Sequence, residues 1–412
     1  MLFEADFNFA NKLVGRKIAH AAERNKGFAR EQYGSRKHHR AIEHALNKQL
    51  TLDLLRFQRR SSILCANDLQ SCYDRIVHSV ASLCLQRQGL AAEEAYCMFT
   101  TLQDLEHTIR TAFGDSDTSY GGDTWVVPMQ GIYQGNGAGP IIWAVISSPL
   151  LQIMKEEGFG TAFKTTISGG HIHLVGYAFV DDTDFLLGQT KGETIQQLIA
   201  RTQEGIDMWE GLVRATGGAL IIEKSAWWLI DVVWDQNGDW KYRKIDEMPG
   251  NLQTRDWDGT QQPLNRKEVS EAFETLGVWI APDGQQDTAF LKLKTKAENW
   301  ASKIQKAKLQ HTDVYYAWVS TITKSLEYPL PALSLSKDQC QQLNKILKLA
   351  AMPKTGVVRS FPNVVVHAPP SHLGLGIPDM YAAQIASHLQ MIQAHGERET
   401  LTGELLRVII WR

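Results

Sequence analysis

The chain has 412 residues, 43% hydrophobic and 21% charged, which predicts an ordinary globular protein of two or three packed subdomains. Its 43 Lys and Arg nearly balance its 45 Asp and Glu, so overall charge gives no indication of nucleic-acid binding. The sequence shows no apolar run of membrane-span length, no signal-peptide pattern and no C-x-x-C spacing among its five cysteines, so we expect an intracellular protein, nuclear or cytoplasmic, without membrane contact or structural zinc.

The first sixty residues are rich in Lys and Arg. Apolar residues at helical spacing predict helices over residues 8–26 and 40–57, with a polar turn at 31–39 between them. The basic residues between Lys12 and Arg60 outnumber the acids of the same stretch. Such a stripe can bind phosphates, and a solvated helix face is the alternative interpretation.

The next segment joins a strand to a helix. Residues 61–74 indicate a short buried strand that ends in acids, and residues 75–89 predict a helix that stops at Gly89. A joint of this kind is a usual place for a functional site. The elements that follow are predicted as a helix, a Gly-rich loop, a strand and a long apolar helix, over residues 92–112, 114–123, 125–129 and 141–158.

Two β-rich runs, at 171–180 and 185–188, flank the acidic turn Asp-Asp-Thr-Asp. This pattern predicts a β-hairpin with carboxylates at its tip. Like charges forced together between buried strands are costly unless a cation neutralises them. Asp-Asp pairs are also common at turns and helix caps, so the pair alone is a weak sign of a metal site.

The second half of the chain alternates strands and helices. Residues 193–216 predict a helix and 218–234 one or two strands, while Asn237-Gly238 and Asp258-Gly259 are typical of hairpin turns. A short strand at 274–282 leads into lysine-rich segments. Three helices are predicted there, over residues 286–312, 313–328 and 337–351.

Three sequence blocks occur in an order that is characteristic of one enzyme family. They are ILCANDLQSCYDRI (63–76), QGNGAGP (134–140) and YAFVDD (177–182). With these blocks the chain resembles the reverse transcriptases, most closely those encoded by non-LTR (LINE-type) retrotransposons. The likeness extends over about residues 7–350.

The resemblance implies a metal site and a nucleotide site. Asp68, Asp181 and Asp182 would be the catalytic metal ligands, and Lys224, in GGALIIEKS (217–225), would be the general acid that protonates the leaving pyrophosphate. An exposed strand lysine is the alternative reading of Lys224. Residues implied to bind the nucleotide are Leu69, Tyr73, Gln134, Gly135, Arg36 and Lys37.

Several of these assignments have simple alternatives. Tyr73 stands at the bulky position that excludes a ribose 2'-hydroxyl, although it could be a core residue. Asp74 is expected to be a helix N-cap ahead of Arg75 rather than a catalytic acid. In TLGVWI (275–280), Leu276 and Gly277 resemble the turn that grips the primer strand.

The implied fold class is α+β: a right-hand polymerase with partial fingers, a palm built from an antiparallel sheet plus helices, and a helical thumb. The corresponding segments are a truncated, basic, helical fingers-like segment (1–60), the palm (61–230, with 91–130 partly fingers), a hairpin insertion (231–270), the primer grip (271–285), the thumb (286–352) and a C-terminal extension (353–412).

The implied activity is RNA-directed DNA synthesis. Two Mg²⁺ ions, for which Mn²⁺ could substitute, would assist the attack of a primer 3'-hydroxyl on a dNTP. The partners would be an RNA template, a DNA primer or RNA–DNA hybrid, and dNTPs. An RNA-dependent RNA polymerase, which shares the palm carboxylates, stays open as an alternative, although Tyr73 and QGNGAGP favour DNA synthesis. A catalytically impaired RNA-binding remnant also stays open, because Gly139 stands where the family usually has Ser and the fingers are expected to be short.

Overall fold

The computed structural model describes residues 4–70, 72–121, 129–164 and 171–410. The chain forms two compact units. The first comprises Met1–Arg40, Arg60–Phe163 and His173–Glu268, and the second Ala41–Arg59, Lys164–Ile172 and Val269–Arg412. The sequence segment 1–60 is therefore divided between the two units, and the functional labels fingers, palm and thumb stay predictions.

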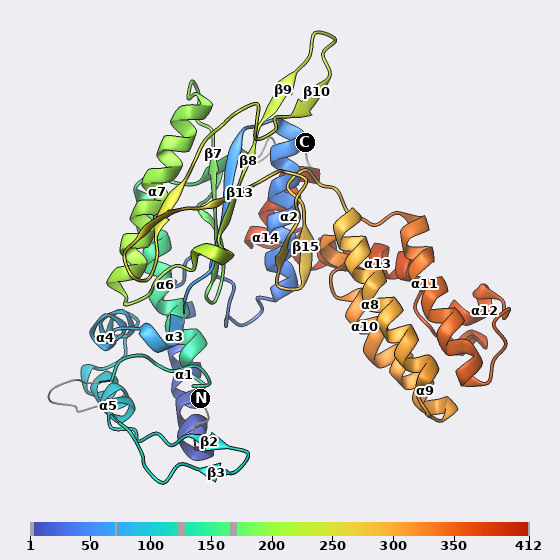
Figure 1. Cartoon of the computed structure of the whole chain (residues 1–412), viewed down its shortest axis with the longest axis horizontal. Helices are drawn as coiled ribbons and strands as arrows, with labels where there is room; N and C mark the ends of the chain where they lie inside the picture. The colour runs from blue at the N-terminus through green and yellow to red at the C-terminus, as the bar shows by residue number, and fades with distance from the viewer. Residues whose placement is uncertain (1–3, 71, 122–128, 165–170, 411–412) are drawn as a thin grey trace. The chain divides into compact units, whose positions relative to one another are not determined.

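The first unit contains a five-stranded sheet in the order β13-β8-β1-β7-β6; three of its strands, β7, β8 and β13, are labelled in Figure 1. The neighbours pair antiparallel, except that β13 runs parallel to β8. Strands β1 and β8 are rich in buried apolar residues. The strands span Ser62–Asn67 (β1), Gly176–Phe179 (β6), Asp182–Gly188 (β7), Ala226–Ile230 (β8) and Asn265–Lys267 (β13).

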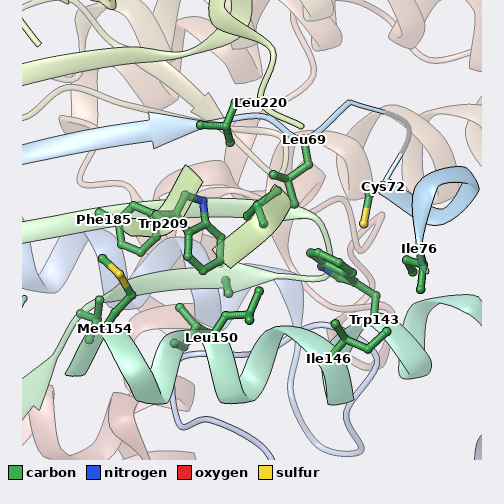
Figure 2. Packing of buried hydrophobic residues seen from close by; sticks show 14 of the residues in the cluster. Leu69, Cys72, Ile76, Trp143, Ile146, Leu150, Met154, Phe185, Trp209 and Leu220 are labelled. Carbon is green, nitrogen blue, oxygen red and sulfur yellow. The ribbon is translucent and has the colours of Figure 1, made fainter. Parts of the chain in front are cut away.

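Helices α6 (Gly139–Glu156) and α7 (Ile195–Ala215) pack on this sheet through one hydrophobic core. Figure 2 shows Trp143, Ile146, Leu150 and Met154 along one side of α6, as side chains three and four residues apart share a helix face. From the sheet and α7, the rings of Phe185 and Trp209 meet edge to face at 4.7 Å between centroids. Burial of these large side chains stabilises the packing of α6 and α7 against the sheet that contains β7.

Both helices are predicted by local sequence signals. Thr194 and Gln197 form a capping box at the start of α7, which satisfies backbone donors that the first turn leaves unpaired. Pro140 lies in the first turn of α6, where its missing N–H costs nothing. Three further helices of this unit are α1 (Ala5–Arg24), α4 (His78–Arg87) and α5 (Ala92–Gln103).

Two predicted helices differ from the structure, and long-range hydrogen bonds give the reason. The helix expected over 75–89 is split into α3 (Cys72–Arg75) and α4, because the backbone N–H of Val77 donates to Thr216 instead of continuing a helix. The helix expected to reach residue 112 ends at Gln103, because His107 pairs with Tyr120 as a β-bridge. The short hairpin β2 (Arg110–Thr111) and β3 (Gly114–Asp115) follows.

The insertion contains the two predicted hairpins. Strands β9 (Val232–Trp234) and β10 (Trp240–Tyr242) flank the Asn237-Gly238 turn, and β11 (Gln253–Arg255) and β12 (Gln261–Pro263) flank Asp258-Gly259. The sequence did not predict that the insertion returns β13 to the edge of the central sheet. The strand expected at 125–129 lies, apart from Met129, outside the described residues.

The second unit is mainly helical. The predicted helix over 313–328 is present, but its middle part is a π-helix between α9 and α10. Ser336 and Gln339 form a capping box at the start of α11. None of the helices within the described ranges is long and apolar enough to cross a membrane.

The elements of this unit are α2 (Ala41–Gln58), β14 (Phe273–Thr275), β15 (Val278–Ile280), α8 (Asp287–Lys306), α9 (His311–Ala317), α10 (Lys324–Glu327), α11 (Lys337–Ala351), α12 (Asn363–His367), α13 (Met380–His395) and α14 (Leu401–Ile410). Two short strands, β4 (Thr161–Lys164) and β5 (His171–Leu174), lie where the two units divide the chain. The chain contains both helices and β-strands, as predicted, so its fold is a mixed α and β fold.

Candidate active site

The predicted hairpin is confirmed, but the expected Asp-Asp-Thr-Asp turn is wrong in its extent, because residues 182–184 pair with β6 as part of β7. Strands β6 and β7 pair in a register that places Phe179 opposite Asp182, so Val180 and Asp181 form a two-residue connection at the tip. The adjacent pairing of β1 with β7 ends with Asn67 opposite Thr183. Asp68 follows Asn67, and Asp182 precedes Thr183. The open ends of β1 and β7 therefore bring Asp68 beside the hairpin tip, since neighbouring strands lie only about 5 Å apart.

The carboxyl of Asp181 is in an unusual electrostatic environment. Burial raises its pKa above the ordinary 3.8, and the nearby negative charge of Asp68 raises it further, while hydrogen bonds from the backbone of Asp181 and Asp182 oppose the shift. Desolvation and a like charge both disfavour the ionised form. A bound cation would reverse both effects, which is a feature of clustered carboxylates at metal sites.

Lys224 contacts the first of these acids. Its Nζ lies 3.1 Å from Oδ2 of Asp68, with 65% of the lysine side chain and 31% of the aspartate side chain exposed. An ion pair this exposed contributes little to folding stability. Its significance is that it fixes where the Lys224 ammonium group lies. It places a proton donor beside a proposed metal ligand.

The segment that carries Lys224 is held on the end of β1 by backbone hydrogen bonds. Ile221 donates to the carbonyl of Asp68 at 2.9 Å, and Gln70 donates to Ala219 at 2.8 Å. This pairing replaces the first part of the strand expected over 218–234. Residues 222–224 form a 3₁₀ turn instead, and the strand begins only at Ala226.

Tyr73 lies close to the acidic tip. Burial is the main cause of its raised pKa, and the charges of Asp181 and Asp182 contribute to the same direction. Its ring faces the start of α6: a methyl group built on Gly139 would lie 3.4 Å from Cδ1 of Tyr73. Tyr73 is half-buried, and its role in nucleotide binding stays a prediction.

This geometry predicts that Gly139→Ser is tolerated. The added Cβ would make ordinary van der Waals contact with the Tyr73 ring and approach no other group closely, so we expect the melting temperature to change by less than about 2 °C. Circular dichroism melting of the variant measures this. A drop of roughly 10 °C would show that the α6 start is tighter than the structure indicates.

The QGNGAGP segment forms a turn ahead of α6. Gly135 has φ 103°, a conformation that strongly favours glycine. The exposed Gln134 is anchored by its backbone, whose N–H donates to Oδ1 of Asp74 at 2.9 Å. The prediction that Asp74 caps a helix ahead of Arg75 is therefore wrong. Asp74 lies inside α3, and its carboxylate accepts a hydrogen bond from the turn that contains Gln134 and Gly135.

Two predicted nucleotide-binding residues have structural contacts. The Leu69 side chain is buried in the hydrophobic cluster, as is that of Leu220 (Figure 2). The backbones of these two residues form a β-bridge, so only the backbone of Leu69 could face a nucleotide. Arg36 forms a bidentate ion pair with Glu23, at 2.8 and 2.9 Å, and also donates to two backbone carbonyls. These contacts favour a structural role for Arg36, whereas Lys37 is exposed.

The predicted primer-grip turn is a tight hairpin in the second unit. Leu276 and Gly277 connect β14 to β15 with φ values of 48° and 82°. Tyr328 donates from its hydroxyl to the carbonyl of Leu276 at 2.9 Å. The buried Lys48 donates to Thr275 at 2.8 Å. The turn is therefore supported from two helical segments of its own unit.

Val180 is the feature of the site that the sequence did not predict. It is a β-branched residue with φ 59°, a conformation that costs about 1–3 kcal/mol and occurs most often at functional sites. The indole of Trp143 donates to its carbonyl at 2.7 Å, and the buried side chain of Gln32 contacts it as well. No local pattern marks Gln32 or Trp143, because both come from distant parts of the chain.

The donors at this site suit a hard cation. They are carboxylate oxygens, which Mg²⁺ and Mn²⁺ prefer. Within the described ranges, however, no three His, Cys, Asp or Glu side chains are gathered closely enough to form a complete metal-binding group. Asp68 and Asp181 form the electrostatically coupled pair, and Asp68 also contacts Lys224. The residues present thus define a two-carboxylate site with an adjacent lysine on a mixed α and β fold.

No protein-family model and no curated protein matches the sequence. Solved structures similar to this chain include telomerase from Candida albicans in complex with a TWJ fragment of telomeric RNA, at 10% identity and TM-score 0.36 over 97% of this chain and 58% of that one. Apo telomerase from Candida tropicalis gives 10% identity and TM-score 0.39, over 97% and 60% of the two chains. The chain spans about three fifths of these structures, and TM-scores below 0.5 do not establish a shared fold.

Proposed function

We propose that this chain is the polymerase core of a reverse transcriptase of the non-LTR retroelement type, which adds dNTPs to a primer 3'-hydroxyl on an RNA template. One observation supports this most directly. The end of β1 and the tip of the β6–β7 hairpin bring Asp68 and Asp181 close enough for their charges to interact, with Tyr73 and Lys224 beside them.

Asp68 and Asp181 are the residues that would hold Mg²⁺, and Asp182, exposed at the start of β7, would add oxygen donors. Bound Mg²⁺ supplies Lewis-acid activation of the primer hydroxyl and neutralises the triphosphate. Lys224, whose Nζ lies 3.1 Å from Oδ2 of Asp68, would give its proton to the leaving pyrophosphate. The half-buried Tyr73 would lie under the sugar of the incoming nucleotide and disfavour a 2'-hydroxyl.

The remaining roles follow the resemblance of the sequence blocks. The exposed turn at Gln134 and Gly135 would face the nucleotide or template, and Lys37 would add a positive charge for phosphate. In the second unit, the Leu276-Gly277 turn would hold the primer strand, and the lysine-rich helices α8 and α11 would contact the duplex backbone. RNA template, DNA primer and dNTPs are the proposed partners.

Extension of oligo(dT) on poly(rA) with dTTP and Mg²⁺ or Mn²⁺ tests the proposal. We expect the wild-type chain to extend the primer and Asp68→Asn to lose roughly a thousandfold in rate. Asp207→Asn is the matched control, because Asp207 is an exposed acid on α7 that accepts a hydrogen bond from Gln203 and has no proposed part in the site. That variant should keep wild-type activity.

Other outcomes would select different functions. Equal incorporation of rTTP and dTTP would indicate an RNA polymerase. Salt-dependent RNA binding without extension by the wild-type chain would indicate a binding protein that retains the fold alone. Equal extension by wild type and Asp68→Asn would mean that the acidic site is not catalytic.

A further inference from the structure

The hairpin tip that carries Asp181 is held by a buried glutamine from the N-terminal part of the chain. Gln32 has no exposed surface. Its Oε1 accepts from the backbone N–H of Val180 at 2.9 Å, and its Nε2 donates to the carbonyl of the same residue at 3.2 Å. One carboxamide therefore satisfies both backbone groups of the residue directly before Asp181.

The same side chain is itself held in a single orientation. Its Oε1 also accepts from the backbone of Gly34 at 2.9 Å, and its Nε2 also donates to Ser147 on α6 at 2.9 Å. Donor and acceptor ends of the amide are thus distinguished by their partners, and rotation by 180° would break these bonds. Such a buried and fully bonded amide is rigid.

The backbone around Gln32 joins the hairpin as well. Gln32 forms a parallel β-bridge with Ala178, in which Tyr33 donates to the carbonyl of Ala178 at 2.8 Å and Ala178 donates to Glu31 at 3.0 Å. Gly34 then passes so close to Val180 that a Cβ on Gly34 would overlap the backbone nitrogen of Val180. The side chain of Gln32 and the main chain of residues 31–34 thus contact the hairpin at residues 178–180.

The need for such support follows from the conformation of Val180. A β-branched residue with φ 59° relaxes to negative φ unless its surroundings prevent this. A change of φ at Val180 would rotate the following peptide and swing Asp181 away from Asp68. Trp143 restrains the carbonyl only, whereas Gln32 restrains both the N–H and the carbonyl.

We infer that Gln32 is a positioning residue for the proposed catalytic site: its carboxamide holds Val180 in the left-handed conformation and thereby keeps Asp181 near Asp68. This inference rests on the proposed function for its catalytic consequence. Its structural part, that Gln32 maintains the hairpin tip, does not depend on any activity. The two parts can therefore be measured separately.

The test replaces Gln32 with Met, which has similar length and volume but neither amide donor nor acceptor. We expect hydrogen exchange in the segment 176–188 to quicken at least about tenfold, because the Val180 N–H loses its acceptor. Mn²⁺ affinity, measured by electron paramagnetic resonance, should fall about 10–100-fold, as for other residues that orient metal ligands. The kcat for dTTP should fall by a similar factor, with KM within about threefold.

Gln384→Met is a closely matched control. Gln384 is a buried glutamine of the second unit whose amide bonds both the N–H and the carbonyl of one residue, Leu335, at 2.9 and 3.0 Å. Its loss should lower the melting temperature much as the loss of Gln32 does. Hairpin exchange, Mn²⁺ affinity and kcat should nevertheless stay at wild-type values.

The outcomes separate the two proposals. Wild-type hairpin exchange and Mn²⁺ affinity in folded Gln32→Met would overturn the role of Gln32, as would equal loosening of the hairpin by Gln384→Met. Failure of the wild-type chain to bind Mn²⁺ and extend a primer would overturn the proposed function, and hairpin exchange alone would then decide the role of Gln32. Should Gln32→Met not fold, Trp143→Phe removes one donor to Val180 and should quicken exchange to a smaller degree.

Discussion

Asp181→Asn should abolish primer extension and at the same time stabilise the protein. Loss of the carboxylate removes a proposed metal ligand, so we expect kcat to fall roughly a thousandfold. Burial and the charge of Asp68 raise the pKa of Asp181, which means that the ionised side chain costs folding free energy at neutral pH. A neutral amide of the same shape avoids that cost, and the melting temperature should rise by about 1–3 °C.

The pH dependence of this stability gain has a definite sign. Below the ordinary pKa of 3.8 the wild-type carboxyl is protonated in both folded and unfolded states, so the two proteins should be equally stable. As pH rises from 3.8 through the raised pKa of the folded state, the wild type loses stability relative to the variant. Thermal melts of both proteins between pH 4 and pH 8 measure the difference.

Two results would contradict this interpretation. A lower melting temperature for Asp181→Asn at pH 7 would show that the carboxylate makes a stabilising bond in the folded protein. Retained extension activity would remove Asp181 from the catalytic site. Asp207→Asn, the exposed control on α7, should change neither quantity.

Gly34→Ala should both destabilise the first unit and impair the site. A Cβ at residue 34 would overlap the backbone nitrogen of Val180 and come within 2.9 Å of the carbonyl carbon of Phe179. Neither is the end of a flexible side chain, so the hairpin itself must move. We expect a loss of about 1–3 kcal/mol in the free energy of unfolding, and a fall in kcat of up to about 100-fold, as for small displacements of catalytic groups.

Gly211→Ala is the control for the chemistry of the substitution. Gly211 is exposed in α7, and a Cβ there would meet no atom within 4 Å. Alanine should therefore stabilise the helix by about 0.5–1 kcal/mol and leave activity unchanged. Chemical denaturation and primer extension of both variants give the comparison. Equal behaviour of the two variants would show that residues 31–34 do not constrain the hairpin.

The two substitutions bear on different parts of the same site. Asp181→Asn changes the charge and leaves the backbone in place, whereas Gly34→Ala moves the backbone and leaves every charged group present. Loss of Mn²⁺ affinity in both would mean that the position of Asp181 matters as much as its charge. Loss of Mn²⁺ affinity in Asp181→Asn but not in Gly34→Ala would mean that the site still binds Mn²⁺ after the hairpin tip has moved.

Local sequence signals determined the elements that carry the site. The acidic hairpin followed from apolar runs on either side of Asp181 and Asp182, and the helix expected over 193–216 is present as α7. The hairpin turns of the insertion followed from Asn237-Gly238 and Asp258-Gly259. In each case the information lies within a few residues, because strand alternation, helix period and turn conformation are local properties.

Tertiary structure alone decided what surrounds these elements. Arg36 contacts Glu23 instead of solvent, Asp74 holds the Gln134 backbone instead of capping a helix, and the segment of Lys224 is a 3₁₀ turn because its backbone pairs with residues 68–70. Gln32 reaches Val180 across 148 positions of sequence. Hydrogen bonds of this kind depend on which segments the fold brings together, and neither residue spacing nor composition predicts which segments those are.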